Sequence, residues 1–250
     1  MIDTHCQLGS SRYRKDRDEV MARARAAGVT RFIEVAYDLS TSERSIALAA
    51  EHDDVWATVG LHPHEVAKAP DDAFERLAEL ARAKEVVAIG ECGLDGGTGA
   101  HALQEQIFRA HLRAARDTGK PLVIHVLRAH DAAPRLLREA GPVTGVLHSY
   151  SGGAGLVPVY RDLGLAFSFA GPVTYGNARR PIAAARAVPD ALLLAETDAP
   201  DQAPEAHRGG RSEPAFVADV IAGLAAARGA SADELAALTT ANARRIFAAW

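Results

Sequence analysis

Residues 122–148, LVIHVLRAHDAAPRLLREAGPVTGVLH, decide the fold, because they hold two short apolar runs that each end in a histidine, His125 and His148. Between the two runs, residues 132–139 have the apolar spacing of an amphipathic helix. A strand, a helix and a second strand in this order form a βα unit whose strands lie parallel in one sheet. The stretch therefore predicts a parallel sheet with histidines at the carboxyl ends of its strands.

The same unit recurs along the whole chain. Strands are expected at residues 1–5, 31–35, 55–60, 86–90, 122–125, 144–148, 165–169 and 192–196, and helices at 18–27, 42–51, 71–83, 103–118, 132–139, 156–162, 177–187 and 213–227. Eight consecutive units favour a closed (β/α)8 TIM barrel over an open doubly wound sheet, which usually has fewer units and a glycine-rich first turn. A capping box of Ser231 and Glu234 begins a further helix at 232–248. We expect one α/β domain over residues 1–250, a barrel with an extra C-terminal helix.

The composition is that of a protein with a large core and no global basic field. The chain has 250 residues, 48% of them hydrophobic, and 28 Lys and Arg against 32 Asp and Glu give a net charge of −4. A polyanionic substrate must therefore be held by a local group of cations.

The two cysteines, Cys6 and Cys92, are too few for a disulfide framework, and no long apolar span interrupts the pattern. We expect a cytoplasmic protein that does not enter a membrane, with no obligate protein partner evident.

Each cysteine follows a ligand-type residue, so the period of two along a strand directs its side chain into the layer between strands and helices. Core packing is therefore the stronger reading for both, over thiolate ligation or nucleophilic catalysis.

Residues of the types that bind metals gather at the ends of the expected strands. They are His5, His62, His64, Glu91, His125, His148 and Asp198. In a barrel the carboxyl ends of the strands meet at one mouth, where the active sites of this architecture lie. Imidazoles and carboxylates from several strands at one mouth favour a divalent metal site. The alternatives are that the histidines are structural and hydrogen-bonded to backbone, and that the carboxylates pair with arginine.

The ordered series of motifs that carries these residues resembles the TatD family of metal-dependent deoxyribonucleases in the amidohydrolase superfamily. The matching segments are IDTHC, VGLHPHE, AIGECGLD, PLVIH, GVLHSYSGG, ETDAP, HRGGRSEP and TTANARRIF, which run from residue 2 to residue 247. The resemblance thus covers nearly the whole chain.

The resemblance implies one or two divalent metal ions, Mg, Mn or Zn, with Glu91 as a bridging ligand and His125 and His148 on one ion. His5 and Asp198 would bind the other, and Asp198 would also orient, or take a proton from, the metal-bound water. The chemistry agrees, because a carboxylate can bridge two cations and neutral imidazoles hold them without cancelling their charge. Glu91 and Asp198 are accordingly the expected catalytic residues.

Gln7 departs from the family pattern, which has a second histidine at this position. An amide oxygen is a poorer donor than imidazole to a zinc-like ion and suits Mg, Ca or Mn better. We therefore expect Gln7 to weaken or alter the first metal position. Gly96 and the segment HVLRAH are further departures, which bear on the substrate more than on the fold.

Five further residues are expected at the substrate. His62 and His64 flank Pro63, so only one of them can easily point inward, and the resemblance suggests that His62 faces substrate or a phosphate; a loop-stabilising hydrogen bond is the alternative. His207, Arg208 and Arg211 lie in the long last loop, where arginine forks suit phosphate. Exposed, solvated charge is the alternative for these three.

The resemblance favours a metal-dependent phosphodiesterase that acts on DNA, trimming single strands from the 3′ end. A second reading is hydrolysis of a carboxylic ester, lactone or amide on the same scaffold. A third is a binding module that has lost a metal. An arginine at the mouth would favour the first reading, and an apolar mouth would favour the second.

Overall fold

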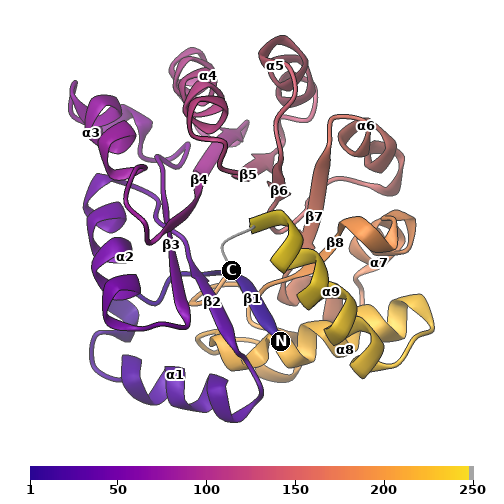
Figure 1. The fold of residues 1–250 in the computed structure, drawn as a ribbon. Helices are drawn as coiled ribbons and strands as arrows, with labels where there is room; N and C mark the ends of the chain where they lie inside the picture. The colour runs from indigo at the N-terminus through magenta and orange to yellow at the C-terminus, as the bar shows by residue number, and fades with distance from the viewer. Residues whose placement is uncertain (248–250) are drawn as a thin grey trace.

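The computed structural model describes residues 1–247, and in it eight parallel strands follow one another around a barrel in chain order (Figure 1). The strands are β1 Ile2–Cys6, β2 Arg31–Glu34, β3 Val55–Val59, β4 Val86–Asp95, β5 Leu122–Leu127, β6 Gly145–Leu147, β7 Leu165–Phe169 and β8 Leu193–Ala195. The TIM-barrel prediction is confirmed, including the C-terminal helix.

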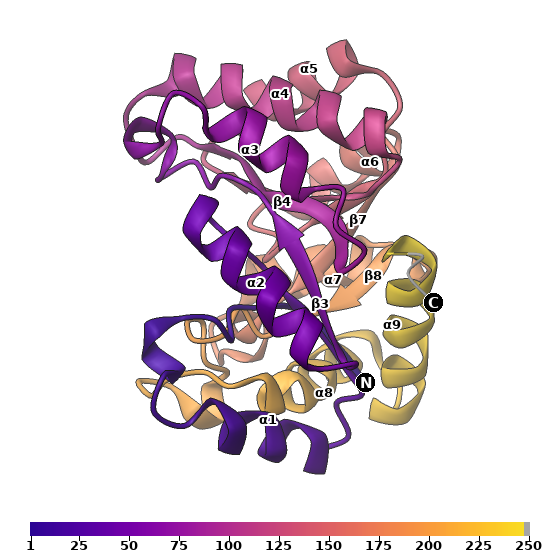
Figure 2. The same ribbon diagram turned by 60° about the vertical axis from the view of Figure 1, so that its left-hand side comes forward.

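Helices surround the strands (Figures 1 and 2). They are α1 Arg17–Ala26, α2 Leu39–Glu51, α3 Ala73–Leu80, α4 His101–Thr118, α5 Ala132–Ala140, α6 Val157–Arg161, α7 Arg179–Ala187, α8 Val217–Arg228 and α9 Ala232–Phe247. The predicted capping box at the start of α9 is present, because Glu234 Oε2 accepts from the Ser231 backbone N–H at 2.8 Å and Ser231 Oγ accepts from the Glu234 backbone N–H at 3.2 Å. No single helix within the described part of the chain is long and apolar enough to cross a membrane. One bent pair, residues 214–228 and 232–247, passes that test together by length and composition only.

The seam between β1 and β8 is closed by a few contacts instead of a long ladder. Cys6 and Ala199 form an isolated parallel bridge, and the Asp198 backbone N–H donates to His5 O at 2.9 Å. The Gln7 backbone N–H donates to Ala199 O at 2.7 Å. The first strand and the loop after the last strand are thereby joined, which brings His5 next to Asp198.

The core has two layers, one inside the barrel and one between strands and helices. The inner layer holds small and branched side chains such as Val123 and Leu194, together with Ala243 and Phe247 of α9. The C-terminal helix therefore packs against the barrel interior and lies beside the start of β1 (Figure 1). Both cysteines, Cys6 and Cys92, are buried in the outer layer, as the period-two argument predicts.

Strand β4 is longer than expected and carries an irregularity at the site. From Ile89 to Cys92 its pairing advances by three residues, while on β5 it advances by two, from Leu122 to Ile124. This extra residue is a β-bulge, a device that turns a side chain toward a new direction. The bulge lies at the position of Glu91.

Candidate metal centre

Gly90 lets the chain bring Glu91 to the barrel mouth. Its φ is +154°, a conformation that residues with a side chain rarely adopt, and a Cβ at this position would lie 2.5 Å from Val123 O. Only glycine therefore allows β4 to approach β5 this closely. Thr58 Oγ1 from β3 donates to Gly90 O at 2.5 Å and fixes the same peptide from the other side.

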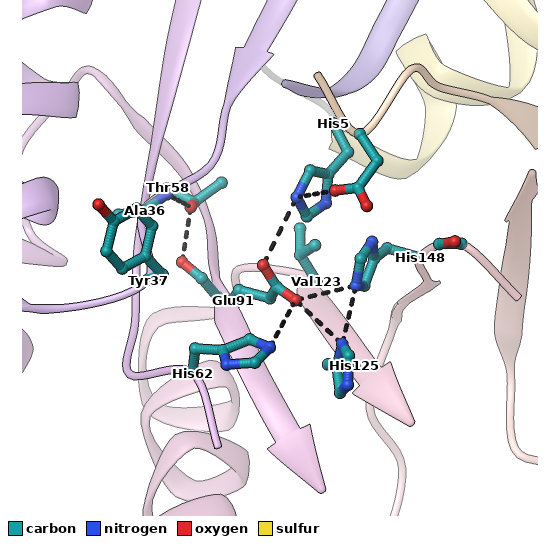
Figure 3. Close-up of polar contacts among 12 residues, drawn as sticks. His5, Ala36, Tyr37, Thr58, His62, Glu91, Val123, His125 and His148 are labelled. Carbon is teal, nitrogen blue, oxygen red and sulfur yellow. Dashed lines mark hydrogen bonds and ion pairs between the residues drawn. The ribbon is translucent and has the colours of Figure 1, made fainter. Parts of the chain in front are cut away.

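Glu91 stands at the centre of the histidines, one of its oxygens facing each side (Figure 3). Its Oε1 lies 2.8 Å from His148 Nε2, 3.2 Å from His125 Nδ1 and 3.3 Å from His62 Nε2. Its Oε2 lies 3.5 Å from His5 Nε2. Four strand ends thus present nitrogen donors to a single buried carboxylate.

His5 and Asp198 form the far side of the site, where His5 Nε2 lies 3.3 Å from Asp198 Oδ1. His5 is completely buried, and neither of its ring nitrogens has a hydrogen-bond partner. A buried nitrogen without a partner carries a large desolvation cost. A cation at this position would satisfy His5 Nε2 together with the two carboxylates that face it.

Two groups of donors share Glu91 and fit a metal ion. The first is His5, Glu91 and His148, and the second is His62, Glu91 and His125. Ligands about 2.0–2.1 Å from one ion lie roughly 3.0–3.3 Å from each other. The spacings of 2.8–3.5 Å around Glu91 agree with this value. Imidazole and carboxylate donors in this arrangement suit a divalent cation.

A second layer of carboxylates orients the histidines. Glu196 Oε1 lies 3.3 Å from His148 Nδ1, so the opposite nitrogen of that ring faces Glu91. Asp95 Oδ2 lies 3.5 Å from His125 Nε2 and 2.7 Å from His64 Nε2. Carboxylates placed behind imidazoles in this way fix the tautomer and raise the basicity of metal-binding histidines.

The electrostatics of the site keep His5 neutral and Glu91 ionised. Burial, together with the nearby His148, lowers the pKa of His5 to about 4. Burial alone would raise the pKa of Glu91, but His148 and the other histidines outweigh it and hold that pKa well below its usual value. For His148 burial acts in the opposite direction, and Glu91 with Glu196 still raises its pKa well above the usual value. The site thus combines the ionised Glu91 with the unprotonated imidazole of His5, which suits a cation.

A sequence model of the TatD-related DNase family matches residues 2–248 of the chain. The chain belongs to this family. It is therefore a TatD-family metal-dependent hydrolase, and the resemblance predicted from its motifs is confirmed.

Two relatives and one solved structure, each matched over nearly its whole length, agree with this family assignment. The chain is 33% identical over 251 residues to the uncharacterized metal-dependent hydrolase YabD of Bacillus subtilis, covering 99% of this chain and 98% of YabD. It is 36% identical over 260 residues to the 3′-5′ ssDNA/RNA exonuclease TatD of Klebsiella pneumoniae, covering 99% and 97%. The crystal structure of the TatD homolog YjjV from Escherichia coli superposes with a TM-score of 0.93 at 30% identity, covering 99% and 98%.

In this TatD-family chain the mouth of the barrel opens into a cavity of about 770 Å³ that Glu91, His62, His125 and His148 line, whereas the buried His5 is not among its lining residues. His62 and His64 both face this cavity, so the expectation that only one of them points inward is wrong. The rings meet edge to face with centroids 4.6 Å apart, and each finds its own carboxylate, Glu91 for His62 and Asp95 for His64.

His207, Arg208 and Arg211 lie outside the residues that line the cavity. Arg211 is held by Asp16 through bonds of 2.9 and 2.6 Å and by Glu213 at 3.0 Å. Arg208 lies over the ring of Tyr175 and 3.3 Å from Glu205, and His207 stacks on Phe216 beside Asp219. The expected patch of cations is thus neutralised by acidic neighbours, some of which are distant in sequence.

Gln7 lines the cavity, where its backbone is fixed by Ala199. A second glutamine, Gln202, also lines it, and its amide donates to Asp198 Oδ2. The sequence patterns do not single out Gln202, because nothing in its spacing marks it as a partner of Asp198. Only the turn of the loop after β8 brings the two side chains together.

Proposed function

We propose that this protein is a divalent-metal-dependent phosphodiesterase that removes nucleotides from the 3′ end of single-stranded DNA. The observation that carries the proposal is the position of Glu91, which belongs to both groups of donors at the mouth of the barrel, with Oε2 facing His5 and Oε1 facing the other three histidines. The relatives described as 3′-5′ ssDNA/RNA exonucleases, at 34–36% identity over nearly the whole chain, support the same reaction.

The proposed ligands are His5, Glu91, Asp198, His125 and His148, with Gln7 at the first position. His62 is added as a proposed ligand because its Nε2 lies as close to Glu91 Oε1 as that of a ligand would. Bound divalent cations lower the pKa of a coordinated water and neutralise the charge that develops on a phosphate. Mg, Mn and Zn are all compatible with this mixture of imidazole, carboxylate and amide donors.

The chain's own residues supply orientation and a proton acceptor. Glu91 and the histidines fix the positions of the metal ligands. Glu196 holds the ring of His148 and Asp95 holds the ring of His125, each from the side away from Glu91. Asp198 lines the cavity and directs Oδ1 toward His5, so in this proposal Oδ1 takes the proton from the attacking water. As ligands the histidines would be neutral and would leave the charge of the cations available to the phosphate.

A second candidate function is favoured by the lining of the cavity. Within residues 1–247 no lysine or arginine lines it, and its lining includes the apolar residues Leu127, Phe169, Val173 and Pro181. These apolar residues suit a carboxylic ester, lactone or amide with an apolar group. In a phosphodiesterase the same residues would contact a nucleobase.

Cleavage of an oligonucleotide tests the proposal. Protein stripped with a chelator is given a 5′-end-labelled single strand with Mg²⁺ or Mn²⁺, and His148→Ala, prepared identically, controls for contaminating nuclease. We expect stepwise shortening that needs the metal and is lost in the variant. If the metal-loaded wild type leaves the strand intact but hydrolyses 4-nitrophenyl acetate or a lactone, the second function is correct.

The absence of bound metal from protein that has been loaded with Mn²⁺ and then desalted would instead indicate a binding module.

A cytoplasmic location stays part of the proposal, supported by two cysteines that are both unpaired.

A further inference from the structure

A chain of hydrogen bonds between side chains joins the loop after β6 to the loop after β8. Gln202 Nε2 donates to Asp198 Oδ2, and Ser149 Oγ donates to Gln202 Oε1 at 2.8 Å. The backbone N–H of Ser149 donates to Glu196 Oε1 at 2.6 Å, and the same oxygen lies 3.3 Å from His148 Nδ1. This series of hydrogen bonds therefore connects His148 to Asp198 around the outside of the donors that face Glu91.

The direction of each bond in this chain is fixed by chemistry. A carboxylate that binds a cation is ionised and can only accept hydrogen bonds, which fits the observed placement of Gln202 Nε2 against Asp198 Oδ2. The amide oxygen then points the other way and needs a donor, which the hydroxyl of Ser149 supplies. Without that donor the amide can turn over and present its oxygen to Asp198, which would repel the carboxylate.

The bond from Gln202 decides which oxygen of Asp198 is available. It occupies Oδ2, and Oδ1 is left facing His5 Nε2 at 3.3 Å. Asp198, Gln202 and Ser149 all have left-handed backbones, with φ of 54°, 49° and 40°. Residues other than glycine keep this conformation only where their surroundings hold them. The three side chains hold one another through the bonds just described.

We propose that Gln202 is a positioning residue for Asp198 and that Ser149 locks the Gln202 amide in the orientation that this requires. The inference rests on the proposed function, because it gives Gln202 an effect through the role of Asp198. Gln202 acts by holding Oδ2, so that Oδ1 stays directed at the cation and at the water from which it takes a proton. The amide itself touches no reacting atom in this assignment.

Two variants and a matched control test the proposal. Gln202→Leu keeps much of the side-chain volume and removes the amide, and Ser149→Ala removes only the lock. Glu205→Gln is the control from the same loop, because the exposed Glu205 carboxylate pairs with Arg208 and lies outside the residues that line the cavity. Metal-free protein is titrated with Mn²⁺ by calorimetry. Separately, kcat and KM are measured for the chromogenic phosphodiester bis(4-nitrophenyl) phosphate at saturating Mn²⁺.

We expect Gln202→Leu to bind Mn²⁺ about 10- to 100-fold more weakly, the usual range for loss of an outer partner of a metal ligand. Its kcat should fall by about the same factor, with KM changed less than about threefold, since positioning of a reacting group is lost and substrate contacts remain. Ser149→Ala should show a smaller loss in both, and Glu205→Gln should match the wild type. The double variant should be no worse than Gln202→Leu, because the two residues act in one chain.

Wild-type Mn²⁺ affinity and kcat in Gln202→Leu would overturn the proposal, as would losses that add in the double variant. If Gln202→Leu does not fold, Ser149→Ala carries the same test. The calorimetric titration needs no substrate. A wild type that binds Mn²⁺ but hydrolyses no phosphodiester therefore refutes the proposed function and leaves the role of Gln202 to be decided by the titration.

Discussion

At the scale of single residues, Glu91 explains why the site has its shape, since it belongs to both groups of donors, with Oε2 facing His5 and Oε1 facing His62, His125 and His148. The sequence allowed His5, Glu91, His125, His148 and Asp198 to be expected at one mouth, and the structure brings all five together. It could not indicate that His62 approaches Glu91, because the direction of a loop side chain depends on packing that spacing does not encode. The ion pairs of Arg211 were hidden for the same reason, as Asp16 lies far away in the sequence.

Gln7→His should strengthen binding of a second metal ion. Gln7 lines the cavity at the position where the family pattern has a histidine, and imidazole is the better donor to Zn²⁺. We expect the affinity for the second ion to rise about tenfold or more, measured by calorimetry with Zn²⁺ and by metal content after dialysis. Gln7→Leu serves as the control that removes the amide without adding a ligand. Equal metal stoichiometry and activity in wild type and Gln7→His would show that this position does not set metal binding.

At the scale of elements, the predicted strands and helices all exist, and their ends differ most where pairing between strands decides them. β4 was expected to end at residue 90 but continues to Asp95, because it keeps pairing with β5 beyond the bulge. A bulge depends on two strands at once, so the alternation within one strand cannot reveal it. Helix α3 is shorter than expected, Ala73–Leu80 instead of 71–83, since an apolar period does not mark where a helix frays.

Helix α4 anchors the loop that carries His62, and this contact should be sensitive to pH. The backbone N–H of Leu61 donates to His111 Nε2 at 3.1 Å, and His111 Nδ1 lies 2.9 Å from Ile107 O, so the ring must be neutral. Burial lowers the pKa of His111 to about 4 from 6.5. The unfolded chain therefore takes up a proton below pH 6.5 that the folded chain takes up only near pH 4. The contribution to stability is present above pH 6.5 and is lost as the pH falls toward 4.

His111→Gln should remove this pH dependence, since an amide can donate and accept but does not titrate here. Urea unfolding of metal-free protein between pH 4.5 and 7 gives the free energy of unfolding of each protein. The wild type should lose up to about 3 kcal/mol more than the variant over this range. Parallel curves for the two proteins would mean that His111 titrates normally in the folded state.

At the scale of the whole molecule, the protein combines a net charge of −4 with a cavity that no described lysine or arginine lines. Its affinity for a nucleic acid strand should therefore depend little on salt. With at most about two phosphates contacted by cations, log kcat/KM for a single-stranded oligonucleotide should fall with log salt by a slope no steeper than about −1.5. Measurement between 50 and 300 mM KCl at saturating Mn²⁺ checks this. A slope several times steeper would show that a cationic track outside the cavity binds the strand.

The measurement that tests the metal centre most directly is anomalous diffraction from crystals grown with Mn²⁺, recorded on both sides of the manganese absorption edge. We predict two peaks, one on each side of the Glu91 carboxylate, at about 2.0–2.3 Å from its oxygens. One peak should also contact His5, His148 and Asp198, and the other His62 and His125. Crystals of Glu91→Gln, grown in the same way, should lose at least one peak. Manganese absent from the surroundings of Glu91, or bound equally in Glu91→Gln, would contradict the assignment of this site as the metal centre.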